Sequence, residues 1–513
     1  MSKFFNTAGL CIPEDHYMVD PLKRLREVER LIEKKLYFTI HAPRQSGKTT
    51  YLYALARKLN AEGKYIALVV SFEQAGYEGI TMEQANELLI FNIYQKAGEQ
   101  LPKDYWPANP QSEKFLNLNH YLKNWSDSQE KPIVLFIDEI DALMDDVLIS
   151  ILRQLRDGYQ SRPKHFPSSV ALVGLRDIRD YKAQIRKGRE SMGTASPFNI
   201  KSDSLFLKNF SREEVFQLLE QHTTETGQVF PEKAKEEIFY LSGGQPWLTN
   251  ALANQIVSGI LEDDYSQAIT PELVSAAKNR LIQRRDTHLD CLIDKLKEER
   301  VKSIVQAIIN GDDLASDSLN ENITYIRDLG IVSQESPLRF ANPIYAEIIP
   351  RIMASGFQES LPMEIATPFF LDKNNEIDMK KIMEAFQEFY RENAESWLER
   401  FAFKESAHHL LMMAFLQRIV NAGGEITREM AVGNGRVDLL VKYNRQRIAI
   451  ELKIKRHNLS LEKAKHQLSN YLDRLGLKEG YLVIFDPGQG EWQDKLYYNE
   501  TEYNDKKIIM VGL

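Results

Sequence analysis

The chain has few cysteines and no long apolar run, and both absences limit what it can be. It holds two cysteines among 513 residues, too few for a disulfide framework or a cysteine-rich zinc site. No apolar run approaches the roughly 20 residues of a membrane span. The first residues also lack the basic segment and the continuous apolar core of a secretory signal. We therefore expect a cytoplasmic protein with no membrane partner.

The chain also lacks a strong charge of either sign, a low-complexity tract and an internal repeat. Its 65 Lys and Arg residues stand against 73 Asp and Glu residues, which gives a net charge of -8. The field of the whole molecule therefore does not attract nucleic acid, and a polyanionic partner requires a local basic patch. With 43% hydrophobic residues, a mainly disordered chain is excluded, and three or four domains are expected.

Apolar patterns divide the chain into parts with different secondary structure. From residue 17 to about residue 199, short apolar runs alternate with helical stretches, which is typical of a parallel sheet with crossover helices. The expected strands are residues 36–42, 65–72, 132–138 and 169–175. The apolar period then changes to 3.6, and Ser211 with Glu214 predicts a capping box at a helix start.

We therefore expect a multidomain α/β protein. Its predicted parts are a parallel-sheet domain (1–203), a helical domain (204–290), a winged-helix module (291–360) and a linker helix with a C-terminal α/β domain (361–513). The winged helix is inferred from two helical patterns, a helix that ends at Gly330 and a short hairpin after it. A long helix is expected over residues 378–397.

A lysine-containing loop follows the first expected strand. Residues 42–50 read APRQSGKTT, which matches G-x-x-x-x-G-K-[ST] except that Ala42 replaces the first glycine. In such a loop, backbone N–H groups and a helix N-terminus hold phosphate oxygens, Lys48 reaches the terminal phosphates and Thr49 binds Mg²⁺. An ordinary strand-turn-helix is the alternative. The predicted nucleotide-binding residues are Arg44, Gln45, Ser46, Gly47, Lys48, Thr49 and Thr50.

Two carboxylates end the third expected strand. The apolar residues 133–137 run directly into Asp138 and Glu139, which places both at the carboxyl end of a parallel sheet, beside the phosphate loop. We expect Asp138 to bind Mg²⁺ and Glu139 to polarise the attacking water. A solvated acidic loop is the alternative. Because the chain has no NKxD or TKxD motif for guanine, ATP is favoured over GTP.

Four segments together resemble AAA-type ATPases related to bacterial and archaeal initiator and STAND ATPases. They are HAPRQSGKTT, VLFIDEID, VGLRDIRDYK and LSGGQPWLTNALA. The resemblance implies that Arg176 senses the γ-phosphate and that residues 243–246 begin a lid near the nucleotide. It also implies a homo-oligomer formed through this domain. Arg153, Arg156 or Arg162 is then the candidate for a finger to the neighbouring subunit, although a surface helix carries such arginines anyway.

Carboxylates and a lysine recur near the C-terminus. Glu451 and Lys453 alternate with apolar residues, so both project from the same face of an expected strand. Asp438 lies on the preceding strand of an expected hairpin and can approach that face. Two carboxylates and an ammonium form a divalent-metal site that activates water. A charge pair on an edge strand is the alternative.

The spacing D-x12-E-x-K resembles the PD-(D/E)XK nuclease superfamily, and the order of expected helices and strands agrees with it. The resemblance implies a restriction-endonuclease-like fold in which Asp438 and Glu451 bind the metal and Lys453 polarises water. It further implies that Glu405 is an outer metal ligand and that Gln467 orients a phosphate or a water.

The same region has a local excess of basic residues. Between residues 436 and 480, eleven Lys and Arg stand against five Asp and Glu, a net charge of +6. The pattern predicts contact with a nucleic-acid backbone, although a solvated face has the same composition. We call the following residues the basic patch: Arg436, Arg445, Arg447, Lys455, Arg456, Lys463 and Lys465.

Together the two groups of motifs predict an enzyme with two chemistries. The prediction is an ATP-binding and ATP-hydrolysing switch coupled to a Mg²⁺-dependent nuclease, acting on DNA more than RNA, in defence against foreign DNA. The alternative is an ATP-dependent nucleic-acid-binding or signalling switch, whose nuclease-like domain binds without cutting.

Overall fold

The computed structural model of the protein forms two compact units. The units are Met1–His288 with Asp317–Val332, and Leu289–Ser316 with Ser333–Leu513. The structure describes residues 3–143, 145–175, 201–284, 292, 294–310, 320–360, 370–372, 376–400, 408, 411–413, 415–416, 425–427, 439–443, 445–455, 460–486, 488 and 491–513. Among these residues, no helix is both long and apolar enough to cross a membrane.

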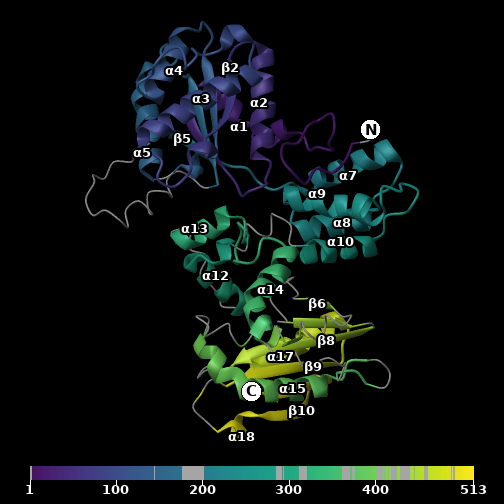
Figure 1. Ribbon diagram of the computed structural model, residues 1–513. Coiled ribbons are helices and arrows are strands. Elements are labelled where there is room, and N and C mark those ends of the chain that lie inside the picture. Colours follow the sequence, from purple (N-terminus) through teal and green to yellow (C-terminus); the bar gives the residue numbers. More distant parts are fainter. Residues whose placement is uncertain are drawn as a thin grey trace. The chain divides into compact units, whose positions relative to one another are not determined.

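The first unit is built on a five-stranded parallel sheet (Figure 1). Its strands are β1 (Tyr37–His41), β2 (Ile66–Ser71), β3 (Ile133–Asp138), β4 (Ser169–Gly174) and β5 (Lys201–Phe206), in the order β2-β3-β4-β1-β5. The first four confirm the predicted strands to within one residue at each end. β5 was not predicted, because its sequence KSDSLF is mostly polar.

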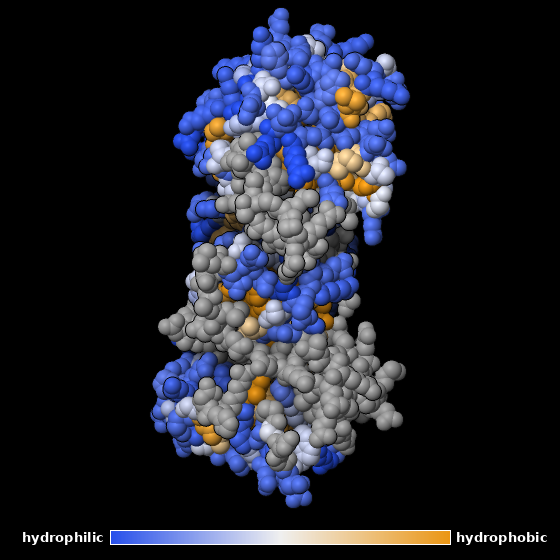
Figure 2. All heavy atoms as spheres, turned by 90° about the vertical axis from the view of Figure 1, so that its left-hand side faces the viewer, coloured by the Kyte–Doolittle hydropathy of each residue, from blue (hydrophilic) through white to orange (hydrophobic). Residues whose placement is uncertain are grey.

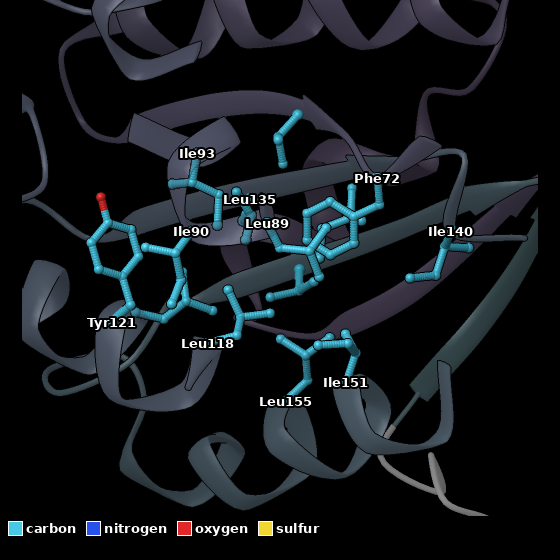
Figure 3. Close-up of a cluster of buried hydrophobic side chains, with 14 of the residues drawn as sticks. Phe72, Leu89, Ile90, Ile93, Leu118, Tyr121, Leu135, Ile140, Ile151 and Leu155 are labelled. Atoms are coloured by element: carbon cyan, nitrogen blue, oxygen red, sulfur yellow. The ribbon is translucent and has the colours of Figure 1, made fainter. Parts of the chain in front are cut away.

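Helices cover both faces of this sheet and fix its carboxyl edge. α1 (Glu27–Glu33) and α2 (Lys48–Glu62) pack on one face, and α3 (Met82–Gln100), α4 (Leu118–Asp127) and α5 (Asp145–Gly158) on the other. Figure 3 shows Leu89, Leu118 and Ile151 of the last three helices in the same cluster of buried side chains as Leu135 of β3. Because neighbouring residues of a strand face opposite layers, Leu135 and Phe136 belong to different core clusters.

A helical bundle follows β5. It contains α7 (Arg212–Thr226), α8 (Glu232–Ser242), α9 (Pro246–Asn254), a π-helical turn (Gln255–Ile260) and α10 (Pro271–Arg284). The capping box predicted from Ser211 and Glu214 is present at the start of α7. Short 3-10 turns in this unit are η1 (Pro21–Lys23), η2 (Glu73–Ala75), η3 (Lys103–Tyr105), η4 (Ile140–Ala142) and η5 (Tyr159–Ser161). α13 (Glu321–Asp328) also belongs to the first unit.

The second unit contains a six-stranded mixed sheet. Its strands are β6 (Glu425–Thr427), β7 (Leu439–Tyr443), β8 (Gln446–Ile454), β9 (Glu479–Phe485), β10 (Tyr497–Tyr503) and β11 (Lys506–Gly512), in the order β10-β11-β9-β8-β7-β6. β7 and β8 pair antiparallel, and β8 and β9 pair parallel. Its described helices are α12 (Glu299–Asn310), α14 (Pro343–Ser360), α15 (Met379–Arg400), α17 (Leu461–Leu475) and α18 (Trp492–Lys495). α15 confirms the long helix predicted over residues 378–397.

The segment after Gly330 is less regular than the predicted hairpin. Gly330 has a positive φ of 72°, as expected for a helix end. Ser333 N–H then donates to the Arg339 carbonyl over 2.8 Å, but the described residues 331–342 contain no regular strand.

On the face in Figure 2, the described apolar residues form small separate patches on a mainly hydrophilic surface.

Candidate active site

The phosphate loop joins β1 to α2. Gln45 and Gly47 have positive φ angles of 57° and 85°, and both lie in the left-handed region that favours glycine. This turn lets α2 begin at Lys48, at the end of the loop that follows the carboxyl end of β1. The unpaired N–H groups and the positive dipole end of α2 therefore face the place where an anion would bind.

Lys48 folds back onto the loop that carries it. Its Nζ donates to the Ala42 carbonyl over 2.7 Å and to the Pro43 carbonyl over 2.8 Å. Burial lowers the pKa of Lys48, whereas the nearby carboxylates of Asp138, Asp141 and Glu139 raise it. The ammonium is thus held by neutral carbonyls, which phosphate oxygens can replace with a stronger, charge-assisted hydrogen bond.

Thr49 and Asp138 meet at the carboxyl ends of the strands, as the sequence predicted. Thr49 Oγ1 donates to Asp138 Oδ2 over 2.7 Å, and Asp138 Oδ1 accepts from Glu139 N–H over 3.0 Å. Burial raises the pKa of Asp138, and the Thr49 hydroxyl and Lys48 partly oppose this rise. A hydroxyl and a carboxylate held this close are oxygen ligands of the kind that Mg²⁺ prefers. These residues fit Mg²⁺ bound with a nucleoside triphosphate.

Glu139 is held by a residue that sequence reasoning missed. Its backbone has a φ of 56°, and its Oε2 accepts a short hydrogen bond from Ser71 Oγ. Ser71 ends β2 and lies opposite Asp138 in the parallel register. A hydroxyl on this carboxylate competes with a water for the same oxygen, so Ser71 determines where Glu139 points. No motif marks this serine.

Arg24 is a second residue that no motif revealed. Its Nη1 donates to the Ser46 carbonyl over 2.9 Å, and its Nη2 donates to the Lys208 carbonyl. The guanidinium also lies 4.9 Å from the centroid of the Phe210 ring. Burial lowers the pKa of Arg24 to about 10, so it remains cationic at neutral pH. It connects the phosphate loop to the chain that enters α7.

The turn before α9 lies beside the phosphate loop, in agreement with the predicted lid. Gln245 caps α9, and its Nε2 donates to the Gln45 carbonyl over 3.4 Å. Gly244 is required next to it, since an added Cβ would lie 2.0 Å from the Phe210 carbonyl oxygen. The close approach of these two backbones therefore positions the first turn of α9.

A cavity of about 110 Å³ opens beside the first turn of α2. The phosphate loop, α9 and the N-terminal segment all contribute to its walls, including Thr7, Cys11, Gly47, Thr50, Trp247 and Asn250. Trp247 Nε1 donates to the Thr7 carbonyl over 2.8 Å, which fixes the N-terminal segment to α9. Figure 1 shows this segment near α7 and α9.

α13 packs against the phosphate loop. His41 Nε2 lies 4.0 Å from Asp328 Oδ1. A Cβ on Gly330 would lie 2.5 Å from Pro43 Cγ, so only glycine allows this approach. Residues 317–332, which include α13, belong to the first unit. The stretches before and after them, Leu289–Ser316 and Ser333–Leu513, belong to the second unit. Sequence reasoning did not expect this contact.

The arginines predicted as the γ-phosphate sensor and as the finger to a neighbouring subunit lie in different surroundings. Arg176 lies outside the described residues. Arg162 Nε donates to the Lys35 carbonyl over 2.8 Å, and its guanidinium lies 3.3 Å from the Tyr159 ring centroid. These contacts hold Arg162 against its own unit, and its role as a finger stays a prediction. Arg153 and Arg156 are exposed on α5.

In the second unit, Glu451 and Lys453 lie on one face of β8, as their spacing predicted. Glu451 is completely buried, and its Oε1 accepts from Lys453 Nζ over 2.7 Å. Gln467 lies on α17, which packs over β8 and β9. Asp438 and Glu405 lie outside the described residues. Within the described part of the chain, no group of three His, Cys, Asp or Glu residues could hold a metal ion.

The basic patch is partly neutralised by its own surroundings. Lys455 pairs with Asp486 over 2.7 Å, and Lys465 pairs with Glu462 over 3.2 Å. Arg447 Nη2 donates to the Leu475 carbonyl over 2.9 Å. Arg436 and Arg456 lie outside the described residues. Glu462 is already included in the net charge of the segment, whereas Asp486 lies outside it, so the pairing of Lys455 lowers the charge available to a polyanion below the sequence count.

The fold and the site define the class of the protein. A parallel sheet with a phosphate loop, a Thr49–Asp138 pair and a helical bundle at the loop form a P-loop nucleotide-binding domain. Residues 16–338 match the family described as "AAA-like domain", which covers more than half of the chain. The chain belongs to this family of AAA-like ATPases.

Other comparisons add structural neighbours. Residues 378–489 match the family described as "Domain of unknown function (DUF8371)". The Walker-type ATPase of Pyrococcus abyssi is 16% identical over 67% of this chain and 99% of its own, with a TM-score of 0.49. A Thermotoga maritima RuvB variant is 16% identical over 62% and 90%, with a TM-score of 0.35. Cdc6p from Pyrobaculum aerophilum is 12% identical over 66% and 94%, with a TM-score of 0.35. No curated protein matches the chain.

Asp138→Asn is expected to stabilise the nucleotide-free protein. Because burial raises the folded pKa of Asp138 above its ordinary value, the folded protein binds this proton more tightly than the unfolded chain does. The Asp138 carboxyl therefore contributes to the free energy of unfolding at low pH. This contribution is lost as the pH rises from about 3.9, the ordinary pKa, to the raised pKa of the folded state. At pH 7 the neutral amide should raise the free energy of unfolding by about 1 kcal/mol.

Thermal unfolding of both proteins between pH 4 and pH 8 checks this expectation. The difference in stability should grow as the pH rises, and the effect of Mg²⁺ on nucleotide affinity should disappear in the variant. A variant that is less stable than the parent at pH 7 would show that ionised Asp138 stabilises the fold.

Proposed function

We propose that the first unit binds and hydrolyses ATP and that the bound nucleotide controls the second unit. The observation that carries the proposal is the arrangement of Lys48, Thr49 and Asp138 at the N-terminus of α2. In this reading, Gly47, Lys48 and the other loop residues bind the phosphates, with Arg44, Gln45, Ser46 and Thr50 around them. Ser46 Oγ is buried with no partner among the described residues, and a phosphate oxygen would supply one.

Hydrolysis is assigned to Glu139. When bound by Thr49 and Asp138, Mg²⁺ supplies positive charge that stabilises the phosphate oxygens. The Glu139 carboxylate orients and polarises the attacking water once the Ser71 hydroxyl releases it. Arg176, at the end of the β4 segment, is proposed as the residue that senses the γ-phosphate.

The contact of α13 with the phosphate loop supports the proposal that the bound nucleotide controls the second unit. When Lys48 leaves the Ala42 and Pro43 carbonyls for phosphate, the loop changes the surface that faces Gly330. The sequence on both sides of residues 317–332 belongs to the second unit. We propose that the module over residues 291–360 is a winged helix that transmits this change or contacts nucleic acid. We also propose that the boundaries between the four domains lie at residues 203, 290 and 360.

For the second unit, we propose a metal-dependent nuclease domain that acts on nucleic acid, DNA before RNA. The buried Glu451 beside Lys453 supports this proposal, since it brings a potential metal ligand and an ammonium together. Leu439, which follows Asp438 in the sequence, pairs with Ile450. Asp438 is proposed as the second metal ligand, with Glu405 and Gln467 in supporting roles.

A binding module that does not cut is the second candidate. The ion pair between Glu451 and Lys453 has the geometry of a structural pair as well as that of a site. The pairing of Lys455 and Lys465 with carboxylates also reduces the attraction to a polyanion. Incubation of the protein with plasmid, linear duplex and single strands, with and without ATP and Mg²⁺, separates the two candidates.

Glu139→Gln is expected to keep ATP affinity while it slows hydrolysis by about 100-fold or more. The amide keeps the shape of the side chain and can still accept the Ser71 hydrogen bond, but it lacks the basicity that activates water. Nucleotide affinity and steady-state phosphate release measure the two effects separately. Glu83→Gln is the matched control, since this carboxylate is exposed in the first turn of α3 and should leave hydrolysis unchanged. Hydrolysis at the parental rate would show that Glu139 is not the catalytic carboxylate.

A further inference from the structure

Asn250 lies on the wall of the cavity beside α2, and its side-chain oxygen has a hydrogen-bonding capacity that no described residue uses. Asn250 lies in α9, is 7% exposed and lines the cavity. Its Oδ1 has no hydrogen-bond partner among the described residues. A buried amide oxygen without a partner costs folding free energy, and such an atom calls for a functional explanation.

The orientation of this amide is set by its own helix. Asn250 Nδ2 donates to the Pro246 carbonyl over 2.8 Å. A carbonyl can only accept a hydrogen bond, so the amide nitrogen must lie on that side and the oxygen on the other. The group of Asn250 that has no hydrogen-bond partner among the described residues is therefore an acceptor and not a donor.

Other polar side chains of the cavity are already engaged. Asn6 Oδ1 accepts from Ala8 N–H over 3.0 Å, and Thr50 Oγ1 accepts from Cys11 N–H over 3.4 Å. Trp247 donates its indole N–H to Thr7. Recognition by Asn250 Oδ1 would therefore not break the hydrogen bonds that these three side chains make.

The position of the cavity indicates which part of a nucleotide can enter it. Phosphates bind at the N–H groups of Gly47 to Thr49, and the cavity lies against Gly47 and Thr50, in the first turn of α2. The nucleoside part then extends into the cavity. Adenine carries an exocyclic amine that donates a hydrogen bond, whereas guanine and hypoxanthine carry an oxygen at the same position.

We infer that Asn250 selects adenine nucleotides by accepting a hydrogen bond from the exocyclic amine of the base. This inference rests on the proposed nucleotide site and adds the residue that determines which base it accepts. An oxo group would face the Asn250 oxygen, and two acceptors repel each other. A base without the amine would leave the oxygen unpaired, and a buried unpaired polar group is what makes such sites strongly selective.

Binding of three diphosphates to the full-length protein tests the inference. ADP carries the amine, purine riboside diphosphate has hydrogen in its place, and IDP has oxygen. We expect ADP to bind about 10- to 100-fold more tightly than the purine analogue, with IDP the weakest. This comparison uses the parental protein alone, so it does not depend on the folding of any variant.

Asn250→Leu should bring the affinities for ADP and the purine analogue to within about threefold of each other, because it removes the acceptor at similar volume. A lid that is merely loosened would weaken all three nucleotides equally and keep their ratio. Asn254→Leu is the matched control, since this residue lies one turn further along α9 and does not line the cavity. It should keep the parental ratio.

The possible failures are distinguishable. Equal affinities of the parental protein for the three diphosphates, or a parental ratio in Asn250→Leu, would overturn the role of Asn250 and leave the proposed ATPase intact. Binding of none of the three would overturn the proposed nucleotide site together with this inference.

Discussion

Lys48→Ala is expected to weaken ATP binding by about 100-fold or more. Hydrogen bonds to charged groups contribute about 1.5 to 3 kcal/mol each, and the loss of about 3 kcal/mol corresponds to about 100-fold in affinity. In the nucleotide-free protein, the ammonium donates to the Ala42 and Pro43 carbonyls. Burial lowers its pKa there, so Lys48 is better stabilised by phosphate than by its present partners.

Calorimetric titration with ATP and Mg²⁺ measures this loss, and thermal unfolding without nucleotide checks the fold. Arg57→Ala is the matched control, since Arg57 is an exposed cation on the same helix and should leave the affinity unchanged. The unfolding midpoint should change little in either variant. An affinity within threefold of the parent would mean that Lys48 does not reach the phosphates, and the phosphate-loop assignment would fail.

The parts of this site that sequence reasoning reached are those fixed by local pattern. An apolar run that ends in Asp138 places this carboxylate at the carboxyl edge of a parallel sheet, and Thr49 at a helix start lies at the same edge. The alternation of Glu451 and Lys453 with apolar residues likewise predicted their common face. In each case the spacing along the chain determines which side chains meet.

The remaining contacts depend on segments that are distant in the sequence and have no periodicity. Arg24 precedes α1 in an irregular segment, yet it donates to the phosphate loop 22 residues later. Ser71 meets Glu139 across 68 residues, only because β2 and β3 are neighbours in the sheet. The approach of Gly330 to Pro43 spans most of the first unit. Nothing in a single sequence marks such pairs before the topology is known.

The basic patch shows a different limit of sequence reasoning. A count of charges along the chain does not tell which of them are paired in space. Lys455 and Lys465 each have an acidic partner, and the partner of Lys455 lies 31 residues away in Asp486. Nucleic-acid affinity predicted from this patch should therefore be modest, and its fall with increasing salt should be shallower than seven unpaired cations would give.

Glu451→Gln is expected to reduce nucleic-acid cleavage by about 1,000-fold or more if the second unit is a nuclease. The substitution keeps an oxygen that can accept from Lys453 Nζ, but it removes the negative charge that would hold the metal. Asp438→Ala should have the same effect. Lys453→Ala should also stop cleavage, because it removes the positive charge that stabilises a hydroxide or the transition-state phosphate.

Binding should survive these substitutions, since the basic patch is untouched and the loss of a carboxylate reduces local repulsion. Cleavage of labelled duplex with Mg²⁺ or Mn²⁺ and binding of the same duplex are measured in parallel. Glu462→Gln is the matched control: this carboxylate is exposed on α17, pairs with Lys465 and should leave cleavage unchanged. Because Glu451 is buried, thermal unfolding must show that the variant is folded. A parental protein that binds DNA or RNA and cuts neither, in any nucleotide state, would establish the second unit as a binding module, in which Glu451 and Lys453 are a structural ion pair.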